Sequence, residues 1–246
     1  MSHLFDLSGR AALVTGASGL LGAHFAQVLA GAGARVVMAA RRVEAMAATA
    51  AALGATTVHL DVTSPASIAA AFDAAGPIDI LVNNAGIAVT KPVLAQTPED
   101  FDQVLGVDLR GCFLVAQEAA RRMVADRRPG SIINIASILG ERIIPGVAGY
   151  TAAKAGLLHL TRQMAVELAR HSIRVNALAP GYIASDINAE FFASEPGQAM
   201  IRRVPQRRLG QPGDLTGPLL LLASDAGVHM TGSTITVDGG HSVSSL

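Results

Sequence analysis

A short apolar run of strand character leads directly into a glycine-rich turn, and the turn leads into a helix-like segment. The apolar run covers residues 11–14, the turn reads Thr-Gly-Ala-Ser-Gly-Leu-Leu-Gly at residues 15–22, and the helical pattern continues over 23–32. Glycines let a backbone turn tightly and approach a ligand closely, and the free N–H groups of a helix N-terminus favour a pyrophosphate. In isolation such a cluster is weak evidence for nucleotide binding. It does restrict the chain to folds that join a strand to a helix through a tight turn.

Strand-like and helix-like stretches alternate along the rest of the chain. This alternation is typical of an α/β protein with a parallel sheet covered by helices on both faces. We therefore predict a Rossmann-type, doubly wound parallel sheet of about seven strands in a single domain spanning residues 1–246. Strands are expected near 11–15, 35–39, 56–61, 78–83, 131–136, 173–179 and 233–237, and helices near 21–32, 43–53, 65–75, 98–127, 149–170 and 213–224. Residues 182–208 resist regular assignment and are predicted to form a substrate lid.

Composition excludes several classes of function. Only 15% of the residues are charged and the formal net charge is +0, so no electrostatic footprint for nucleic acid or an anionic membrane is present. The N-terminal residues show neither a basic nor an apolar targeting region, and Cys112 is the single cysteine, so we expect a cytoplasmic protein. The seven histidines show no close ligand spacing, and no metal site is expected.

The candidate chemistry lies in Ser137, Tyr150 and Lys154. Positions four residues apart share one face of a helix, so the phenol of Tyr150 and the ammonium of Lys154 can address one reacting atom. A neighbouring cation favours the ionised form of a phenol, which suits it to acid–base catalysis. A Tyr and a Lys meet at this spacing by chance often enough that the pair alone is weak evidence, and a serine after an apolar strand is usually a turn residue.

Six motifs in the right order make the whole chain resemble the short-chain dehydrogenases/reductases in their single-domain form. The motifs are the turn at 15–22, Asp61-Val62, residues 83–86 (Asn-Asn-Ala-Gly), the Ser137, Tyr150 and Lys154 set, Pro180-Gly181 with Ser185, and residues 237–240 (Val-Asp-Gly-Gly). The resemblance implies a nicotinamide cofactor. It also implies an enzyme that interconverts a ketone and a secondary alcohol, with Tyr150 passing the proton, Ser137 donating a hydrogen bond to the same oxygen, and Lys154 holding the nicotinamide ribose.

The resemblance also implies which residues contact the cofactor. Asp61 and the Val62 backbone would hold the adenine, residues 84–86 would line the adenosine side, and the loop from Pro180 to Ser185 would contact the nicotinamide. In isolation Asp61 could be only a helix cap, and residues 83–86 only a turn. The full implied set is Gly16, Ser18, Gly19, Leu21, Gly22, Arg41, Asp61, Val62, Asn84, Ala85, Gly86, Tyr150, Lys154, Pro180, Gly181, Ile183 and Ser185.

The choice between NAD(H) and NADP(H) depends on charge at the end of the second strand. An acidic residue there would bind a ribose 2′-hydroxyl, whereas an arginine would pair with a 2′-phosphate. The sequence gives Ala40-Arg41-Arg42, so NADP(H) is preferred and NAD(H) remains possible. Two observations weigh against this preference: both arginines could be ordinary solvated residues, and many relatives that use the phosphorylated cofactor carry a basic residue where Gly19 stands. The middle glycine of the turn usually falls at the position of Leu20.

Asp108 is a second departure from the family pattern. Most relatives have an asparagine here, which supports a water chain to the active-site lysine. Asp108 is almost isosteric, and we include it in the catalytic set with Ser137, Tyr150 and Lys154. An ionised carboxylate near Lys154 would offset part of the effect of the ammonium on Tyr150. The alternative is a surface or helix-bend aspartate without a catalytic part.

Three functional hypotheses remain at this stage. The first is an oxidoreductase for a small ketone or secondary alcohol. The second is a 3-oxoacyl thioester reductase, for which Arg121-Arg122 and Arg127-Arg128 give only a partial basic patch. The third is a non-catalytic nucleotide sensor, which would not need the Ser137, Tyr150 and Lys154 set. The resemblance further implies a homotetramer paired through the long helices; the substrate itself is not determined.

Overall fold

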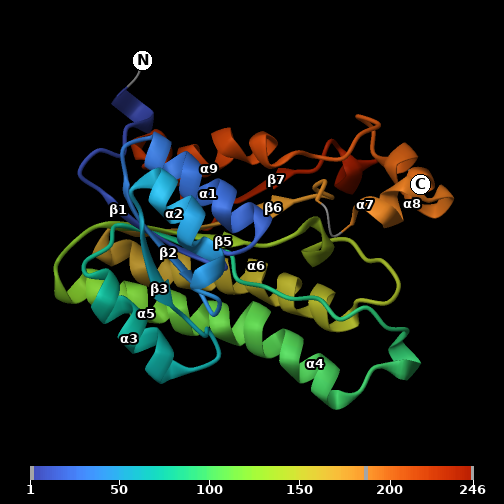
Figure 1. The fold of residues 1–246 in the computed structure, drawn as a ribbon, viewed down its shortest axis with the longest axis horizontal. Helices are drawn as coiled ribbons and strands as arrows, with labels where there is room; N and C mark the ends of the chain where they lie inside the picture. Colours follow the sequence, from blue (N-terminus) through green and yellow to red (C-terminus); the bar gives the residue numbers. More distant parts are fainter. Residues whose placement is uncertain (1–2, 186–187, 245–246) are drawn as a thin grey trace.

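The computed structural model describes residues 3–185 and 188–244, and the central feature is a parallel sheet of seven strands in the order β3-β2-β1-β4-β5-β6-β7. Figure 1 shows this sheet running through the middle of the molecule. The strands are β1 (Ala11–Thr15), β2 (Arg35–Ala40), β3 (Thr56–His59), β4 (Ile80–Asn83), β5 (Gly130–Ile135), β6 (Ile173–Pro180) and β7 (Thr234–Val237). The fold predicted from the alternating pattern is confirmed, and the order reverses between β1 and β4.

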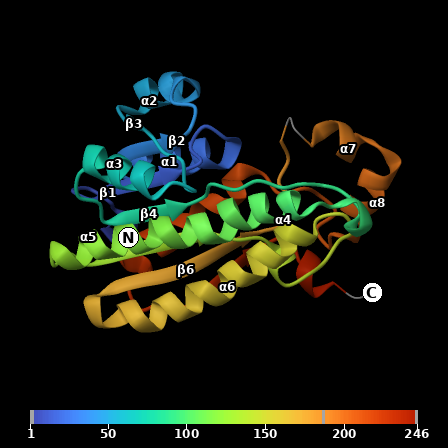
Figure 2. The ribbon, with the colours of Figure 1, turned by 90° about the horizontal axis from the view of Figure 1, so that it is seen from below.

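Helices cover both faces of the sheet (Figures 1 and 2). They are α1 (Leu20–Gly31), α2 (Ala47–Leu53), α3 (Pro65–Ala75), α4 (Pro98–Leu105), α5 (Cys112–Ala125), α6 (Ala148–Leu168), α7 (Ala189–Ala193), α8 (Glu195–Arg203) and α9 (Thr216–Ala223). Several begin at signals visible in the sequence. Ser64 caps α3 and Thr97 forms a capping box with Asp100 at the start of α4, and in both helices a proline occupies the first turn.

Two hydrophobic layers hold the sheet between its helices. On one face Phe25 and Leu29 of α1 pack with Leu219 of α9, and on the other Phe72 of α3 packs with Met123 of α5. All five residues of β1 are buried, as expected for a central parallel strand covered on both sides. The carboxyl ends of the parallel strands therefore meet at one edge, where loops are free to build a site.

Two expected elements differ from the structure. The helix expected over 98–127 is interrupted by a π-helical segment at Gly106–Gly111, which separates α4 from α5. The segment 182–208 was expected to be irregular, but α7 and α8 lie within it. The physical reason is that Ser194 caps α8 and Pro196 occupies its first turn, where a proline begins a helix rather than breaking it. Residues 186–187 of the predicted lid lie outside the described residues.

Residues 11–34 contain no Asp, Glu, Lys or Arg, and they hold β1, the glycine turn and the whole of α1. Among the residues that the structure describes, no helix is both long enough and apolar enough to cross a bilayer.

Candidate active site

The turn after β1 and the loop after β4 are joined at the carboxyl edge of the sheet. The hydroxyl of Thr15 accepts hydrogen bonds from the backbone N–H groups of Asn84 (2.9 Å) and Ala85 (3.0 Å). The side-chain amide of Asn84 donates in turn to the carbonyl oxygens of Thr15 (3.0 Å) and Gly16 (3.3 Å). These reciprocal bonds fix two segments that are distant in sequence and explain why Asn84 is a polar residue at this position.

Two glycines in the turn are required by close backbone approach. Gly16 has a φ of 63°, and a Cβ there would lie 2.9 Å from the Cα of Ala85. A Cβ on Gly22 would collide with the carbonyl oxygen of Gly16 and lie 2.7 Å from the Cα of Ala17. Gly19, which precedes α1, is less constrained, because its nearest neighbour would be 3.5 Å away. The Gly16-x-x-Gly19-x-x-Gly22 spacing thus makes the bend even though its middle glycine is displaced.

A groove of about 760 Å³ runs along this edge and brings together most of the predicted cofactor residues. Those in its lining are Gly16, Ser18, Gly19, Leu21, Gly22, Arg41, Asp61, Val62, Asn84, Ala85, Gly86, Ile183 and Ser185. The lining taken over the described residues omits Tyr150, Lys154, Pro180 and Gly181. It adds residues that the motifs did not indicate, among them Arg42, Thr63, Ile87 and Gln103. Of these four residues, only Arg42 could have been expected from the sequence, because it adjoins Arg41.

Positive charge lies at the end of the groove formed by β2 and β3. Arg41 and Arg42 both line the groove, and neither forms a hydrogen bond or ion pair with any residue that the structure describes. Asp61 faces the same region, and its Oδ1 accepts from the backbone N–H (2.9 Å) and hydroxyl (2.7 Å) of Thr63. These two bonds lower the pKa of Asp61, and the charge of Arg41 lowers it further. The guanidinium donors therefore remain available to an anionic ligand.

The long helix α6 positions Tyr150 and Lys154 on one face. The Lys154 Nζ lies 5.4 Å from the centre of the Tyr150 ring and donates a 3.1 Å hydrogen bond to the carbonyl oxygen of Ile135, at the end of β5. Ser137 follows β5 directly, and its Oγ accepts from the backbone N–H of Leu139 at 3.1 Å. Tyr150 packs against the cluster formed by Ile138, Leu139 and Val147. The three predicted catalytic side chains thus lie where β5 and α6 meet.

Asp108 points into this site from the π-helical segment. Its Oδ2 lies 3.1 Å from the Lys154 Nζ, and its Oδ1 accepts from the backbone N–H of Ile87 at 2.7 Å. The pair is almost completely buried, with 0% of the Asp108 side chain and 5% of the Lys154 side chain exposed. The position of Asp108 beside Lys154 rules out the alternative of a surface aspartate.

The burial of this ion pair shifts both titrations. Burial raises the pKa of Asp108, and the charge of Lys154 and the hydrogen bond from Ile87 offset part of that rise. Burial alone would lower the pKa of Lys154, but the negative charge that Tyr150 and Asp108 can carry outweighs it, and the pKa is raised. Lys154 is accordingly held as an ammonium between a carboxylate and a phenol.

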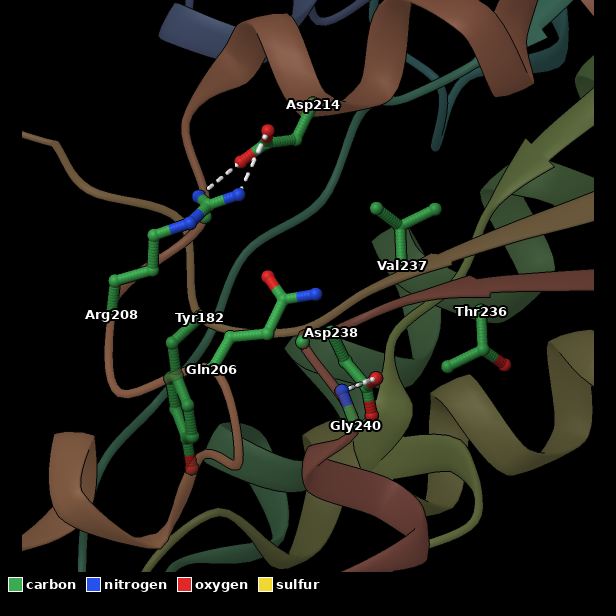
Figure 3. A pocket seen from close by; sticks show the side chains of 10 residues that line it. Tyr182, Gln206, Arg208, Asp214, Thr236, Val237, Asp238 and Gly240 are labelled. Atoms are coloured by element: carbon green, nitrogen blue, oxygen red, sulfur yellow. Dashed lines mark hydrogen bonds and ion pairs between the residues drawn. The ribbon is translucent and has the colours of Figure 1, made fainter.

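A second cavity, of about 380 Å³, lies on the other side of the loop that follows β6 (Figure 3). Tyr182, Gln206 and Asp238 line it, and Arg208 pairs with Asp214 at 2.6 Å along its wall. Gly181 anchors this loop to β7, because its N–H donates a hydrogen bond to the Val237 carbonyl oxygen. A Cβ on Gly181 would lie 2.8 Å from the Cα of Asp238, so the two segments pack closely. The sequence motifs around Pro180 did not single out Tyr182, which lies between two residues that they did.

Comparison with known proteins agrees with this geometry. A family model described as enoyl-(acyl carrier protein) reductase matches residues 16–242. The chain is 39% identical over 256 residues to a gluconate 5-dehydrogenase of Gluconobacter oxydans (strain 621H), covering 99% of this chain and all of that one. It is 37% identical over 239 residues to a 3-oxoacyl-[acyl-carrier-protein] reductase of Rickettsia bellii (strain RML369-C), covering 96% of this chain and 98% of the relative.

A solved structure gives the same agreement in three dimensions. The crystal structure of a gluconate 5-dehydrogenase from Burkholderia cenocepacia J2315, in complex with NADP and tartrate, superposes with a TM-score of 0.94 at 37% identity and covers 99% of each chain.

Proposed function

The chain belongs to the short-chain dehydrogenase/reductase family, and on this basis we propose that Ser137, Tyr150, Lys154 and Asp108 carry out its reaction. The protein is an oxidoreductase that interconverts a secondary alcohol and a ketone with a nicotinamide cofactor. The observation that carries the residue assignment is the burial of Lys154 between Tyr150 and Asp108, with its Nζ bonded to the carbonyl oxygen of Ile135 at the end of β5. A nucleotide sensor would have no use for this set.

In the reductive direction negative charge develops on the carbonyl oxygen of the substrate. Tyr150 donates a proton to that oxygen and Ser137 donates a hydrogen bond to it. Lys154 holds its charge beside the phenol and stabilises the phenolate that the proton transfer leaves. Asp108 fixes the Lys154 ammonium through the buried ion pair, and Ile87 fixes Asp108. The cofactor, when bound, supplies or accepts the hydride; in the oxidative direction the proton roles reverse.

The groove residues fit a dinucleotide. The glycine turn leaves the backbone open at the N-terminus of α1, which suits a diphosphate, and Asp61, Val62 and residues 84–86 line the adenosine side. Arg41 and Arg42, with no partner among the described residues, support a preference for NADP(H) over NAD(H), because a guanidinium pairs well with a 2′-phosphate. Residues Ile183 and Ser185 line the same groove at its far end and would contact the nicotinamide, with Pro180 and Gly181 supporting their loop.

The thioester reductase is a second candidate because three of the similar proteins carry that name. Its acidic carrier would need an available basic surface near the site. Arg122 is paired with Asp73 at 2.8 Å and Glu118 at 2.7 Å, and Arg128 is paired with Asp79. Arg122 lies near the C-terminal end of α5, and Arg128 lies two residues before Gly130 at the start of β5. Both are therefore at the edge of the sheet opposite the active site. Arg121 and Arg127 form no ion pair with any residue that the structure describes, so the predicted basic patch is only partly neutralised, and it is remote from Tyr150.

A homotetramer in the cytoplasm is part of the same proposal. Apolar side chains are exposed on the helices expected to pair, namely Phe101 on α4, Val124 on α5 and Val166 on α6, the last with 78% of its surface accessible. The mass in solution at micromolar concentration tests this assembly, and a monomer would contradict it.

The reaction is tested with a panel of ketones and secondary alcohols, each assayed with NADPH or NADH, or with their oxidised forms, by the absorbance of the reduced nicotinamide. We expect turnover of at least one small polar ketone–alcohol pair and a higher kcat/KM with the phosphorylated cofactor. Turnover confined to acyl thioesters would favour the second candidate instead.

A further inference from the structure

Two buried polar atoms beside the proposed active site have no partner among the residues that the structure describes. They are the hydroxyl of Tyr182 and the Nδ1 of His241. A buried polar group without a hydrogen bond costs about 1–3 kcal/mol, so native proteins almost always satisfy such groups. The Tyr182 hydroxyl and the His241 Nδ1 are therefore available to form hydrogen bonds with a bound molecule.

These two side chains form one aromatic cluster with the lid. The ring centroid of Tyr182 lies 5.6 Å from that of His241 and 5.7 Å from that of Phe192 on α7. Both unpartnered atoms thus belong to side chains of one aromatic cluster. In Figure 3 the Tyr182 hydroxyl points away from the Arg208–Asp214 pair. Because Phe192 packs over Tyr182, movement of α7 and α8 would open the way to both atoms.

The cluster continues directly from the catalytic residues. Tyr182 is close enough to Tyr150 for the charge of that phenol, together with burial as the larger cause, to raise the pKa of Tyr182. On its other side, Arg142 donates a 2.7 Å hydrogen bond to the carbonyl oxygen of Ser242, the residue after His241. A substrate whose carbonyl contacts Tyr150 would thus extend past Tyr182 toward His241 and Arg142.

The far end of this path carries positive charge. Arg142 uses one donor on Ser242, and Arg203, at the C-terminal end of α8, has no hydrogen bond or ion pair within the described part of the chain. The end of α8 is held near His241, since the N–H of Gln206 donates to the Gly239 carbonyl at 3.2 Å and a Cβ on Gly239 would lie 2.9 Å from Val204.

The Asp238 carboxylate lies close to His241 but forms no ion pair with Arg142 or Arg203. Both oxygens of Asp238 already accept backbone hydrogen bonds, Oδ1 from Gly240 at 2.8 Å and Oδ2 from Ser242 at 2.6 Å. Burial lowers the pKa of His241. The charges of Arg142 and Arg203 lower it further, whereas the charge of Asp238 opposes them. The imidazole is therefore held neutral and can donate a hydrogen bond from one nitrogen.

We infer that Tyr182, His241, Arg142 and Arg203 bind a carboxylate at the end of the substrate remote from the reacting carbon, so that the substrate is an open-chain polyhydroxy acid or its keto form. This inference rests on the proposed function, which leaves the substrate class open. Guanidinium groups recognise carboxylates through charge-assisted hydrogen bonds, and the Tyr182 hydroxyl gains the acceptor that it lacks.

The kinetic test compares matched pairs that differ only in the terminal group: D-gluconate with sorbitol, and D-mannonate with mannitol. We expect the wild-type kcat/KM to favour the acid. Arg203→Met should lower the acid-to-polyol ratio about 10- to 100-fold, the loss typical of a hydrogen bond to a charged group, and Tyr182→Phe about 10-fold. Arg202→Met is the control. Arg202 is exposed on the same helix, but unlike Arg203 it is not among the charges that act on His241. The inference would be overturned if Arg203→Met and Tyr182→Phe had the same acid-to-polyol ratio of kcat/KM as the Arg202→Met control.

A binding measurement separates this inference from the proposed function. In the enzyme–NADPH complex an alcohol cannot transfer hydride, so the acids and polyols can be titrated in by calorimetry. We expect the acids to bind at least 10-fold more tightly than the polyols, and Arg203→Met to remove that difference. Turnover of the polyols without tighter binding of either acid would leave the proposed function standing and overturn the carboxylate site. Tight, Arg203-dependent binding of the acids without their turnover would support the carboxylate site and overturn the polyhydroxy acid as the substrate.

Discussion

The two sides of the active site are built in different ways. The cofactor side, between β1, β2 and β4, consists mainly of backbone and small residues: Gly16 and Gly22 leave no room for a Cβ, and Thr15 and Asn84 bind main-chain atoms. The substrate side, beyond β5 and β6, consists of large side chains such as Tyr182 and His241 that come from separate segments. The cofactor side should therefore be especially sensitive to added volume. The substrate side should respond to the loss of single functional groups.

Tyr150→Phe should give the largest effect. It removes only the hydroxyl that passes the proton, so turnover should fall about 10²- to 10⁴-fold, the usual contribution of a general acid. The Kd for NADPH, measured by fluorescence titration, should change little, because the groove is built by other elements. Retained turnover would exclude this chemistry. Loss of NADPH binding would show that the cofactor side and the substrate side do not act independently.

Gly22→Ala should damage the cofactor side through volume alone. The new Cβ would meet backbone atoms of Gly16 and Ala17, so we expect the free energy of unfolding to fall by about 1–3 kcal/mol. NADPH binding should weaken in parallel. Gly19→Ala is the matched control, since its Cβ would have 3.5 Å of clearance. Equal stability of the two variants in denaturant unfolding would contradict the close approach described here.

Arg41→Ala tests the charge of the groove without adding volume. Loss of one guanidinium–phosphate contact should raise the KM for NADPH about 10- to 100-fold and leave the KM for NADH nearly unchanged. The two cofactors thus serve as each other's control. Parallel changes in both would mean that Arg41 supports the loop rather than the 2′-phosphate.

Asp108→Asn should have the smallest effect, and it acts where the two sides meet. The amide can keep the hydrogen bond from Ile87, but it removes the negative charge that opposes Lys154. A stronger field from Lys154 favours the ionised phenol of Tyr150. The acidic limb of the kcat profile for alcohol oxidation should therefore move to lower pH, by about one unit or less. Asp108→Ala, which leaves Lys154 buried without its ion-pair partner, should instead lower stability by about 3–5 kcal/mol. An unchanged pH profile would show that Asp108 has only a structural part.

Local sequence patterns were sufficient for the sheet and for most of the cofactor groove. The strand–glycine–helix junction and the apolar run of β1 depend on neighbours within a few residues, which periodicity and glycine spacing report directly. The same reasoning was wrong for α8, which lies within the segment expected to be irregular, because Pro196 occupies the first turn of that helix and does not interrupt it. It also missed the π-helical segment, where Gly106–Gly111 departs from the helical spacing that the sequence analysis assumed.

The order of the motifs along this chain determined its family, its doubly wound sheet and the residues that could do chemistry, since backbone sterics and side-chain periodicity act over short distances. Only the tertiary structure decided that Asp108 pairs with Lys154 and that Tyr182 and His241 lie together. Those contacts join helices and loops far apart in sequence. Their geometry follows from how the layers pack around the sheet, a property that no local pattern contains.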